Sequence, residues 1–409
     1  MPIRRSQIKR DQKRGGSGRP DFVLLILMAI LIVVGLAMIS SASVVMSENI
    51  AGKSNYYFYN QAIAAGIGLV ALYIFSKIDY RFWAKISPFL MIASLFLLIA
   101  VFIPGLNIEH NGAARWVNLG FANLQPSEPT KLALILFLAA WFEKKGKDIK
   151  DFRKGVLPFL AIVLVFVGLV LMEPDMGTTS VLVAISGVMF VVAGANWSHI
   201  GALIATGMAG VWALILMAPY RMARLTTFLD PAADSSGSGY QIRQALIAIG
   251  SGGVLGLGFG KSRQKFNYLP EAATDSIFAV ICEELGLIRA GLVIIVILLF
   301  VLRGYKIAKD APDAFSRLVA AGITTWVAAQ SFINILAIVG MMPLTGVPLP
   351  FISYGGTSLA MLLAACGILL NISKHSVEGG SNANRGFGRW NWRPHFPGVG
   401  SRHRASKIR

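Results

Sequence analysis

The sequence predicts an all-α, polytopic membrane protein with about ten transmembrane helices. Of its 409 residues, 55% are hydrophobic and only 14% are charged, whereas a soluble domain carries about 25% charged residues. Because each membrane crossing needs ~20 apolar residues, this composition supplies roughly ten crossings. A water-soluble fold is therefore excluded, and little of the chain is left for a domain outside the membrane.

Ten apolar segments follow one another along the chain. The first, residues 22–43, follows a basic tail and is longer than the core of a cleaved signal peptide. The predicted domains are a basic cytoplasmic tail (1–21), a transmembrane domain (22–373) and a basic C-terminal tail (374–409) whose Gly, Arg, Asn and Ser content predicts disorder. The remaining segments cover residues 57–76, 86–104, 129–142, 155–172, 177–195, 200–218, 275–302, 316–340 and 357–373.

The distribution of Lys and Arg predicts the orientation. With both termini in the cytoplasm, 28 of the 38 basic residues lie inside and nine lie outside, as the positive-inside rule expects. Six of those nine fall in one long extracytoplasmic loop, residues 219–274, between the seventh and eighth spans. The net charge of +18 is thus explained by topology and anionic lipid, and nucleic acid is not an expected partner. The sequence predicts a multi-pass membrane protein with both termini in the cytoplasm.

Almost all the polar motifs lie in three outward segments, which predicts a site facing outward. These segments run from Gly105 to Lys131, from Tyr220 to Asp275 and from Met341 to Gly356. In the first, Arg115 and Trp116 either contact substrate or simply anchor the chain at the membrane interface, where Trp is enriched. Further along, Ser127 is a plausible helix cap. Glu128 and Lys131 share one helix face at the membrane surface, where they form either part of a site or a local ion pair.

The second segment is the long outer loop, and its glycine-rich centre is not a nucleotide-binding loop. Only three residues separate Gly256 from Gly260, whereas a Walker loop needs four, and Leu255 stands where the first glycine belongs. The basic residues here can hold a diphosphate, or can attract lipid headgroups in general. They are Arg221, Arg224, Arg243, Lys261, Arg263 and Lys265.

Asp275 stands where this loop enters the eighth span. It is either a helix cap or a general base beside the cationic loop. Glu283 and Glu284 lie deeper, where charge is costly, and we expect hydrogen-bonded structural roles for them, with Arg289 as one candidate partner. Glu173 and Asp175 lie between two spans, where they line a polar cavity or order the turn.

These motifs resemble the signature segments of the shape, elongation, division and sporulation family, which includes the FtsW and RodA proteins. The similar stretches occur in the family's order across residues 22–373. The KFNYLPEA stretch and the basic tails resemble the division-type member more than the elongation-type member. The stretches are NGAARWVNLG with QPSEPTKL, EPDMGTT, YLPEAATDSIFAVICEELGL and PLTGVPLPFISYGGTS.

The resemblance implies a ten-helix enzyme that polymerises peptidoglycan strands from lipid II with a cognate class B penicillin-binding protein and other division proteins. It implies that Asp275 is the catalytic carboxylate and that Trp116, Glu128 and Lys131 are functional positions. This chain departs from the family pattern at Ala273, where His is usual, and at Arg289, where a small residue is expected. A His-assisted base is therefore excluded.

The predicted reaction is an inverting glycosyl transfer. A sugar hydroxyl of one lipid-linked disaccharide attacks the anomeric carbon of another, Asp275 takes the proton, and the polyprenyl diphosphate leaves towards the basic loop. Cys282 and Cys366 lie in apolar runs, and no His or Cys cluster indicates a tightly bound metal. An assisting divalent cation, Mg²⁺ or Mn²⁺, is compatible with this chemistry. The alternatives are a lipid II flippase, an elongation-type polymerase and a non-enzymatic division scaffold.

Overall fold

The computed structural model describes residues 19–110, 113–118, 120, 123–217, 219–230, 234 and 237–375. The tails at residues 1–18 and 376–409 lie outside this part of the chain. The elements are α2 (Phe22–Ala42), α3 (Val44–Ala51), α4 (Tyr56–Lys77), α5 (Tyr80–Ala100), β1 (Asn107–His110), β2 (Ala113–Asn118), β3 (Asn123–Leu124), α6 (Ser127–Lys145), a 3₁₀ turn (Gly146–Lys150), a π turn (Phe152–Val156), α7 (Leu157–Met172), α8 (Met176–Val192), α9 (Trp197–Leu216), α10 (Pro219–Leu229), α11 (Ser238–Gly252), α12 (Ile277–Lys309), α13 (Ala314–Ile338) and α14 (Gly356–Ser373).

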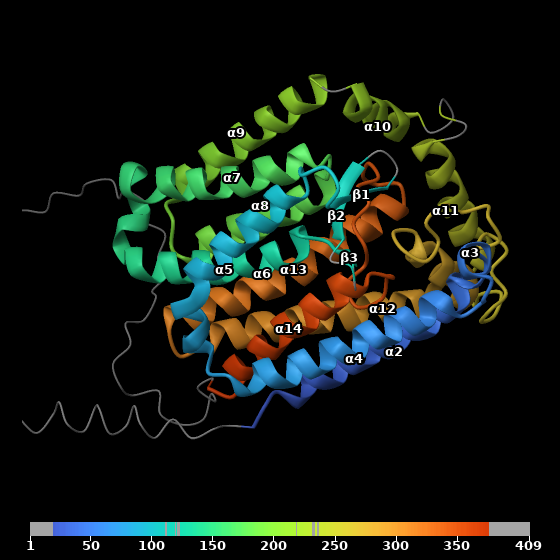
Figure 1. Cartoon of the computed structure of the whole chain (residues 1–409), viewed down its shortest axis with the longest axis horizontal. Coiled ribbons are helices and arrows are strands. Elements are labelled where there is room, and N and C mark those ends of the chain that lie inside the picture. Colours follow the sequence, from blue (N-terminus) through green and yellow to red (C-terminus); the bar gives the residue numbers. More distant parts are fainter. Residues whose placement is uncertain are drawn as a thin grey trace, which may run out of the picture. The chain divides into compact units, whose positions relative to one another are not determined.

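Each predicted apolar segment corresponds to one helix, namely α2, α4 to α9 and α12 to α14 (Figure 1). Within the described residues, seven helices are long and apolar enough to cross a membrane, and α8 is a shorter apolar helix. The predicted polytopic helical fold is therefore confirmed. Two details differ from the expectation, because the first outward segment contains a small sheet and the long outer loop contains α10 and α11.

Helix α13 lies at the centre of the helical assembly, packed against α6, α8 and α12 (Figure 1). Its residues are mostly buried, including the large side chain of Trp326. Helices α4, α5 and α12 instead expose many large apolar side chains, as helices that face lipid do. The polar residues of α13 are consequently shielded from lipid by its neighbours.

Small residues allow the helices to approach closely. Lipid tails are as apolar as leucine, so helices in a membrane associate through packing rather than through a hydrophobic driving force. Helix α4 packs on α14 with Gly68 against Ala360 and Leu363, and Gly367 of α14 lies against the backbone of Leu72. A Cβ atom at Gly68 would lie 2.6 Å from the end of the Leu363 side chain, and one at Gly367 would lie 2.6 Å from the carbonyl oxygen of Leu72, so Gly367 in particular allows the close approach.

Helix α12 is interrupted at Gly286, whose φ of 80° is not helical. A break leaves backbone groups without their helical partners, which is costly at membrane depth. Here the chain after α11 supplies the missing hydrogen-bond partners. The amides of Leu257 and Gly258 donate to the carbonyl oxygens of Glu283 and Glu284, and the amide of Leu287 donates to Gly253. We call residues 253–265 the glycine loop.

The small sheet follows α5 and has three antiparallel strands in the order β1-β2-β3. Trp116 on β2 pairs with Ile108 on β1, and a register shift follows Ile108. Val117 pairs with Leu124 of β3, which leads directly into α6. This sheet fixes the position of Arg115 above the helices.

Candidate active site

Asp275 immediately precedes α12, yet it does not cap that helix. The N-cap is Ser276, and it makes no side-chain capping bond. Thr274 does not cap the helix either, because its hydroxyl donates to Glu271. Within the described part of the chain, neither carboxylate oxygen of Asp275 has a hydrogen-bond partner. The side chain is partly exposed and therefore accessible to a ligand.

The loop between α13 and α14 holds the backbone around Asp275. The Asn334 side-chain amide donates to the carbonyl oxygens of Asp275 (2.8 Å) and Val347 (2.7 Å). The Ser353 hydroxyl donates to the carbonyl of Thr274 at 2.6 Å. Gly346 leaves room for the carboxylate, since a Cβ atom there would lie 3.3 Å from Asp275 Oδ2. The second and third outward segments therefore meet at Asp275.

The corner between α7 and α8 closes another side of the site. Arg115 donates to the carbonyl oxygens of Glu173 (3.2 Å) and Pro174 (2.6 Å), which joins the sheet to this corner. Asp175 caps α8 by accepting from the amide and hydroxyl of Thr178. Gly177 packs tightly against the α13–α14 loop. The first outward segment and the α7–α8 corner thus lie beside Asp275, and we call these surroundings of Asp275 the recess.

Two acids in this recess, Asp275 and Glu173, have raised pKa values. Burial raises the pKa of Asp275 to about 7, with the charges of Glu271 and Asp175 adding to the effect and Arg115 and Arg224 opposing it. Asp275 is therefore close to half-protonated at neutral pH, which suits a group that exchanges a proton in a reaction.

Glu173 is a second acid with a raised pKa. Its side chain is 1% exposed, and within the described residues neither carboxylate oxygen has a hydrogen-bond partner. Burial and the nearby charge of Asp175 raise its pKa to about 8, although Arg115 acts in the opposite direction. A buried carboxylate without partners is stable only in the protonated form. Glu173 is therefore neutral at pH 7.

Glu128 and Lys131 form the predicted ion pair, but its location differs from the expectation. Lys131 Nζ lies 2.8 Å from Glu128 Oε1, and both side chains are 2% exposed. Lys131 also donates to Gln330 and lies over the ring of Trp326, both on α13. The pair is therefore in the core between α6 and α13, because α13 covers the face of α6 that we expected at the membrane surface.

The cap predicted at the start of α6 is wrong. The N-cap residue is Pro126, and no side-chain capping bond is present. The hydroxyl of Ser127 is buried and has no partner among the described residues.

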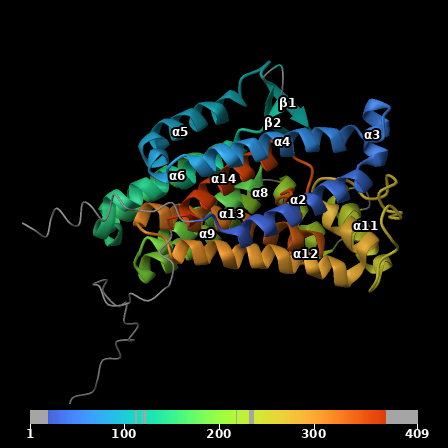
Figure 2. The ribbon, with the colours of Figure 1, turned by 90° about the horizontal axis from the view of Figure 1, so that it is seen from below.

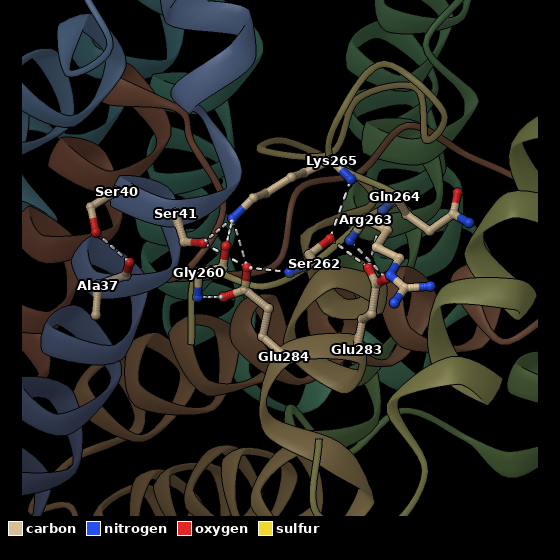
Figure 3. A network of polar contacts seen from close by, with 10 residues as sticks. All are labelled: Ala37, Ser40, Ser41, Gly260, Ser262, Arg263, Gln264, Lys265, Glu283 and Glu284. Carbon is tan, nitrogen blue, oxygen red and sulfur yellow. Dashed lines mark hydrogen bonds and ion pairs between the residues drawn. The ribbon is translucent and has the colours of Figure 1, made fainter. Parts of the chain in front are cut away.

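Glu283 and Glu284 bind the glycine loop (Figure 3). Glu283 accepts from the Ser262 hydroxyl and the Arg263 amide, and Glu284 accepts from the amide of Gly260. Their predicted structural role is confirmed. The predicted partner Arg289 is wrong, because its guanidinium instead donates to the carbonyl of Leu255.

The basic residues of the outer segment divide into two groups. Lys265 is buried and forms an ion pair with Glu284 at 3.0 Å, so its ammonium group points inward (Figure 3). Lys261 and Arg263 are exposed. Arg224 on α10 donates to the carbonyl of Leu344 beside the site, and Arg243 is half-buried on α11. The side chain of Arg221 lies outside the described part.

Sequence reasoning missed the polar residues that α13 contributes. Gln330 binds Lys131, and Asn334 binds the backbone of Asp275. The available signal was two amide side chains four residues apart within an apolar segment, since polar residues inside a membrane span usually have a specific role.

The described acids around Asp275 do not include a three-residue cluster of metal-ligating type. Within the described ranges, no three His, Cys, Asp or Glu side chains are placed to hold a metal ion. Asp275 and Asp175 share their surroundings with Arg115, whose positive charge opposes a bound cation.

Comparisons with known proteins agree on one family. The family model for cell cycle proteins of the FtsW, RodA and SpoVE type matches residues 22–378. Stage V sporulation protein E of Bacillus subtilis is 43% identical over 87% of this chain and 98% of its own length. A probable peptidoglycan glycosyltransferase FtsW of Geobacter sp. (strain M18) is 37% identical over 86% of this chain and 96% of its own length.

Solved structures give the same result. A chain of a peptidoglycan synthase complex matches with a TM-score of 0.73 and 27% identity, covering 87% of this chain and 97% of the other. RodA of Thermus thermophilus matches with a TM-score of 0.65 and 28% identity, covering 87% and 96%. Fold, site and similarity together show that this chain belongs to the FtsW/RodA/SpoVE family of polytopic membrane proteins.

Proposed function

We propose that this chain is a peptidoglycan glycosyltransferase that polymerises lipid II into glycan strands at the outer face of the cytoplasmic membrane. Its family membership and relatives named as probable peptidoglycan glycosyltransferases support the activity. The observation that carries the mechanism is the carboxylate of Asp275, which is accessible, uncommitted to any hydrogen bond in the described structure, and surrounded by backbone that other elements hold in place.

In the proposed step, the sugar hydroxyl of one substrate attacks the anomeric carbon of the other. A new carbon–oxygen bond forms as the bond from that carbon to the diphosphate breaks. Asp275 accepts the hydroxyl proton, and the released polyprenyl diphosphate carries away the bonding electrons. With a pKa of about 7, Asp275 is a stronger base than an ordinary aspartate and is still largely ionised slightly above neutral pH.

The exposed cations suit the leaving diphosphate. Negative charge grows on that group in the transition state, so nearby cations accelerate the reaction and do not merely bind the substrate. Lys261 and Arg263 are exposed on the glycine loop and are candidates, whereas Arg115 and Arg224 are the cations whose charges act on Asp275. Lys265 is less suitable because Glu284 already neutralises it. Arg115 on β2 binds the α7–α8 corner beside Asp275, and we propose that it contacts the substrate together with the adjacent Trp116.

The test is polymerisation by the purified full-length chain with fluorescent lipid II. Asp275→Asn keeps the shape of the side chain but cannot accept the proton, so glycan ladders should disappear while lipid II still binds. Asp148→Asn makes the same change at an exposed residue near the opposite end of α6, and should leave polymerisation intact.

The result also separates the alternatives. Ladders from Asp275→Asn at the wild-type rate would refute the role of Asp275. Translocation of lipid II by the wild-type chain without any ladders would instead support a flippase, and neither activity would support a scaffold.

We further propose a division role, a class B penicillin-binding protein as partner, and both termini in the cytoplasm. The matching chain from a peptidoglycan synthase complex and the FtsW-named relatives support this assignment. Co-purification with candidate transpeptidases, compared between division and elongation proteins, tests the partner.

A further inference from the structure

A groove of about 200 Å³ runs between α2 and α12 on the membrane-facing surface. These two helices lie side by side (Figure 2). The groove is apolar except for one cationic residue, and its lining is Ile30, Leu31, Val34, Leu285, Arg289, Leu292, Val293 and Val296.

Arg289 is exposed on a surface where charge is costly. It follows the break at Gly286, and its neighbours Leu287 and Ile288 are 65% and 55% exposed, as lipid-facing residues are. A guanidinium group has five donors, and the hydrogen bond to Leu255 at 3.2 Å uses one of them. Within the described residues no carboxylate pairs with Arg289, because Glu283 and Glu284 are bound to the glycine loop (Figure 3).

The groove has the dimensions of one membrane leaflet. From Leu287 to Val296, after the break, the helix rises ~14 Å at 1.5 Å per residue, about half of the ~30 Å hydrocarbon core. The hydrogen bond between Ser41 and Glu284 places the last turn of α2 level with the turn of α12 that precedes its break, next to the groove. Side chains on a helix lean towards its N-terminus, so Arg289 extends towards that end, where lipid headgroups lie.

We propose that this groove binds one anionic phospholipid from the leaflet on the Asp275 side, with its phosphate on Arg289 and an acyl chain between α2 and α12. Charge complementarity identifies the occupant, because an apolar channel that ends at an unpaired guanidinium fits a chain with an anionic head. The groove is separate from the recess around Asp275. The backbone of Asp275 is held by Asn334 of α13 rather than by a residue of α2.

The experiment is native mass spectrometry of the purified full-length chain titrated with phosphatidylglycerol or phosphatidylcholine. We expect the first phosphatidylglycerol to bind about tenfold more tightly than phosphatidylcholine, the effect of one charged hydrogen-bond pair. Arg289→Gln should remove this preference, whereas Arg289→Lys should retain part of it. Val34→Trp, which fills the groove and keeps the charge, should weaken binding of both lipids.

Lys53→Gln is the matched control, because it removes an exposed cation outside the groove, before α4. It should leave the preference unchanged. An unchanged preference in Arg289→Gln, or an equal loss in Lys53→Gln, would overturn the proposal. Polyprenyl diphosphate is the competing source of the same chemistry, and binding of that lipid at this site without binding of phosphatidylglycerol would also overturn it.

Discussion

Asp275 acquires its chemical character from residues far away in the chain. Burial raises its pKa most, the charges of the nearby Glu271 and of the distant Asp175 add to this, and Arg115 and Arg224 lower it. Asn334 and Ser353 hold its backbone. Among the described residues the carboxylate itself has no hydrogen-bond partner, which distinguishes it from Asp175, whose carboxylate caps α8.

The rate of polymerisation should depend on the ionisation of Asp275. Because only the ionised form accepts a proton, kcat/KM should rise about tenfold between pH 6 and pH 8, with a midpoint near the pKa of about 7. Arg115→Met removes a cation that lowers this pKa, so its midpoint should move to higher pH. Arg317→Met, at an exposed residue in the first turn of α13, is the control. A flat profile for the wild type would contradict the proposed base.

Glu173 should make the folded protein less stable as the pH rises. Its pKa is about 8 in the fold and 4.5 in the reference state, so the folded state holds a proton that the unfolded state releases. The contribution of Glu173 to the free energy of unfolding is therefore greatest below about pH 4.5 and falls until about pH 8. Glu173→Gln cannot ionise, so its melting temperature relative to wild type should increase from pH 5 to pH 8.5. A constant difference across this range would show that Glu173 is ionised in the fold.

Among the elements, α12 is the one whose structure depends most on another segment. Its break at Gly286 exposes backbone groups that the glycine loop then satisfies. Glu283 and Glu284, in the turn before the break, bind the same loop through their side chains. The break and the loop therefore form as one unit, and this unit supports the backbone that leads to Asp275.

Gly286→Ala should destabilise the protein strongly. A Cβ atom there would lie 2.3 Å from the amide nitrogen of Gly256, and the φ of 80° is itself unfavourable for alanine. We expect a loss of more than ~2 kcal/mol, measured as a lower melting temperature. Gly291→Ala is the matched control in the same helix, because nothing lies within 4 Å of the added atom. Equal melting temperatures for the two variants would contradict this account of the break.

At the scale of the whole molecule, the helices place Asp275 at one end. The basic turns that follow α6, Gly146–Lys150 and Phe152–Val156, lie at the other end. Gln61, near the start of α4, binds Ser353 beside the site, and α6 runs from the recess towards Lys147. The excess of Lys and Arg on the predicted inner segments agrees with a site on the outer side.

Labelling of cysteine variants tests this orientation. Cys282 and Cys366 are buried, so the wild-type chain should give little background. In intact cells, a membrane-impermeant maleimide should label Lys53→Cys and should label Lys147→Cys only after permeabilisation. Both lysines are exposed, so access to the reagent depends on the membrane. The reverse pattern would place Asp275 on the cytoplasmic side and contradict the proposed function.

The sequence alone determined the ten helices, because a crossing requires a continuous apolar run and this property is local. It also led to the hypothesis that Asp275 and the basic loop form the site, which the proposed experiments test. It did not determine which charges are buried. The pair Glu128–Lys131 was expected at the surface and lies in the core, and Arg289 was assigned the wrong partner.

Only the tertiary structure decided which distant residues meet. Asn334 is 59 residues from Asp275, and Arg115 is 58 residues from Glu173. Local periodicity shows which face of a helix is apolar but not which other helix covers it. The burial of a charge, its partners and its proton affinity depend on that neighbour, so they follow from the packing of the helices.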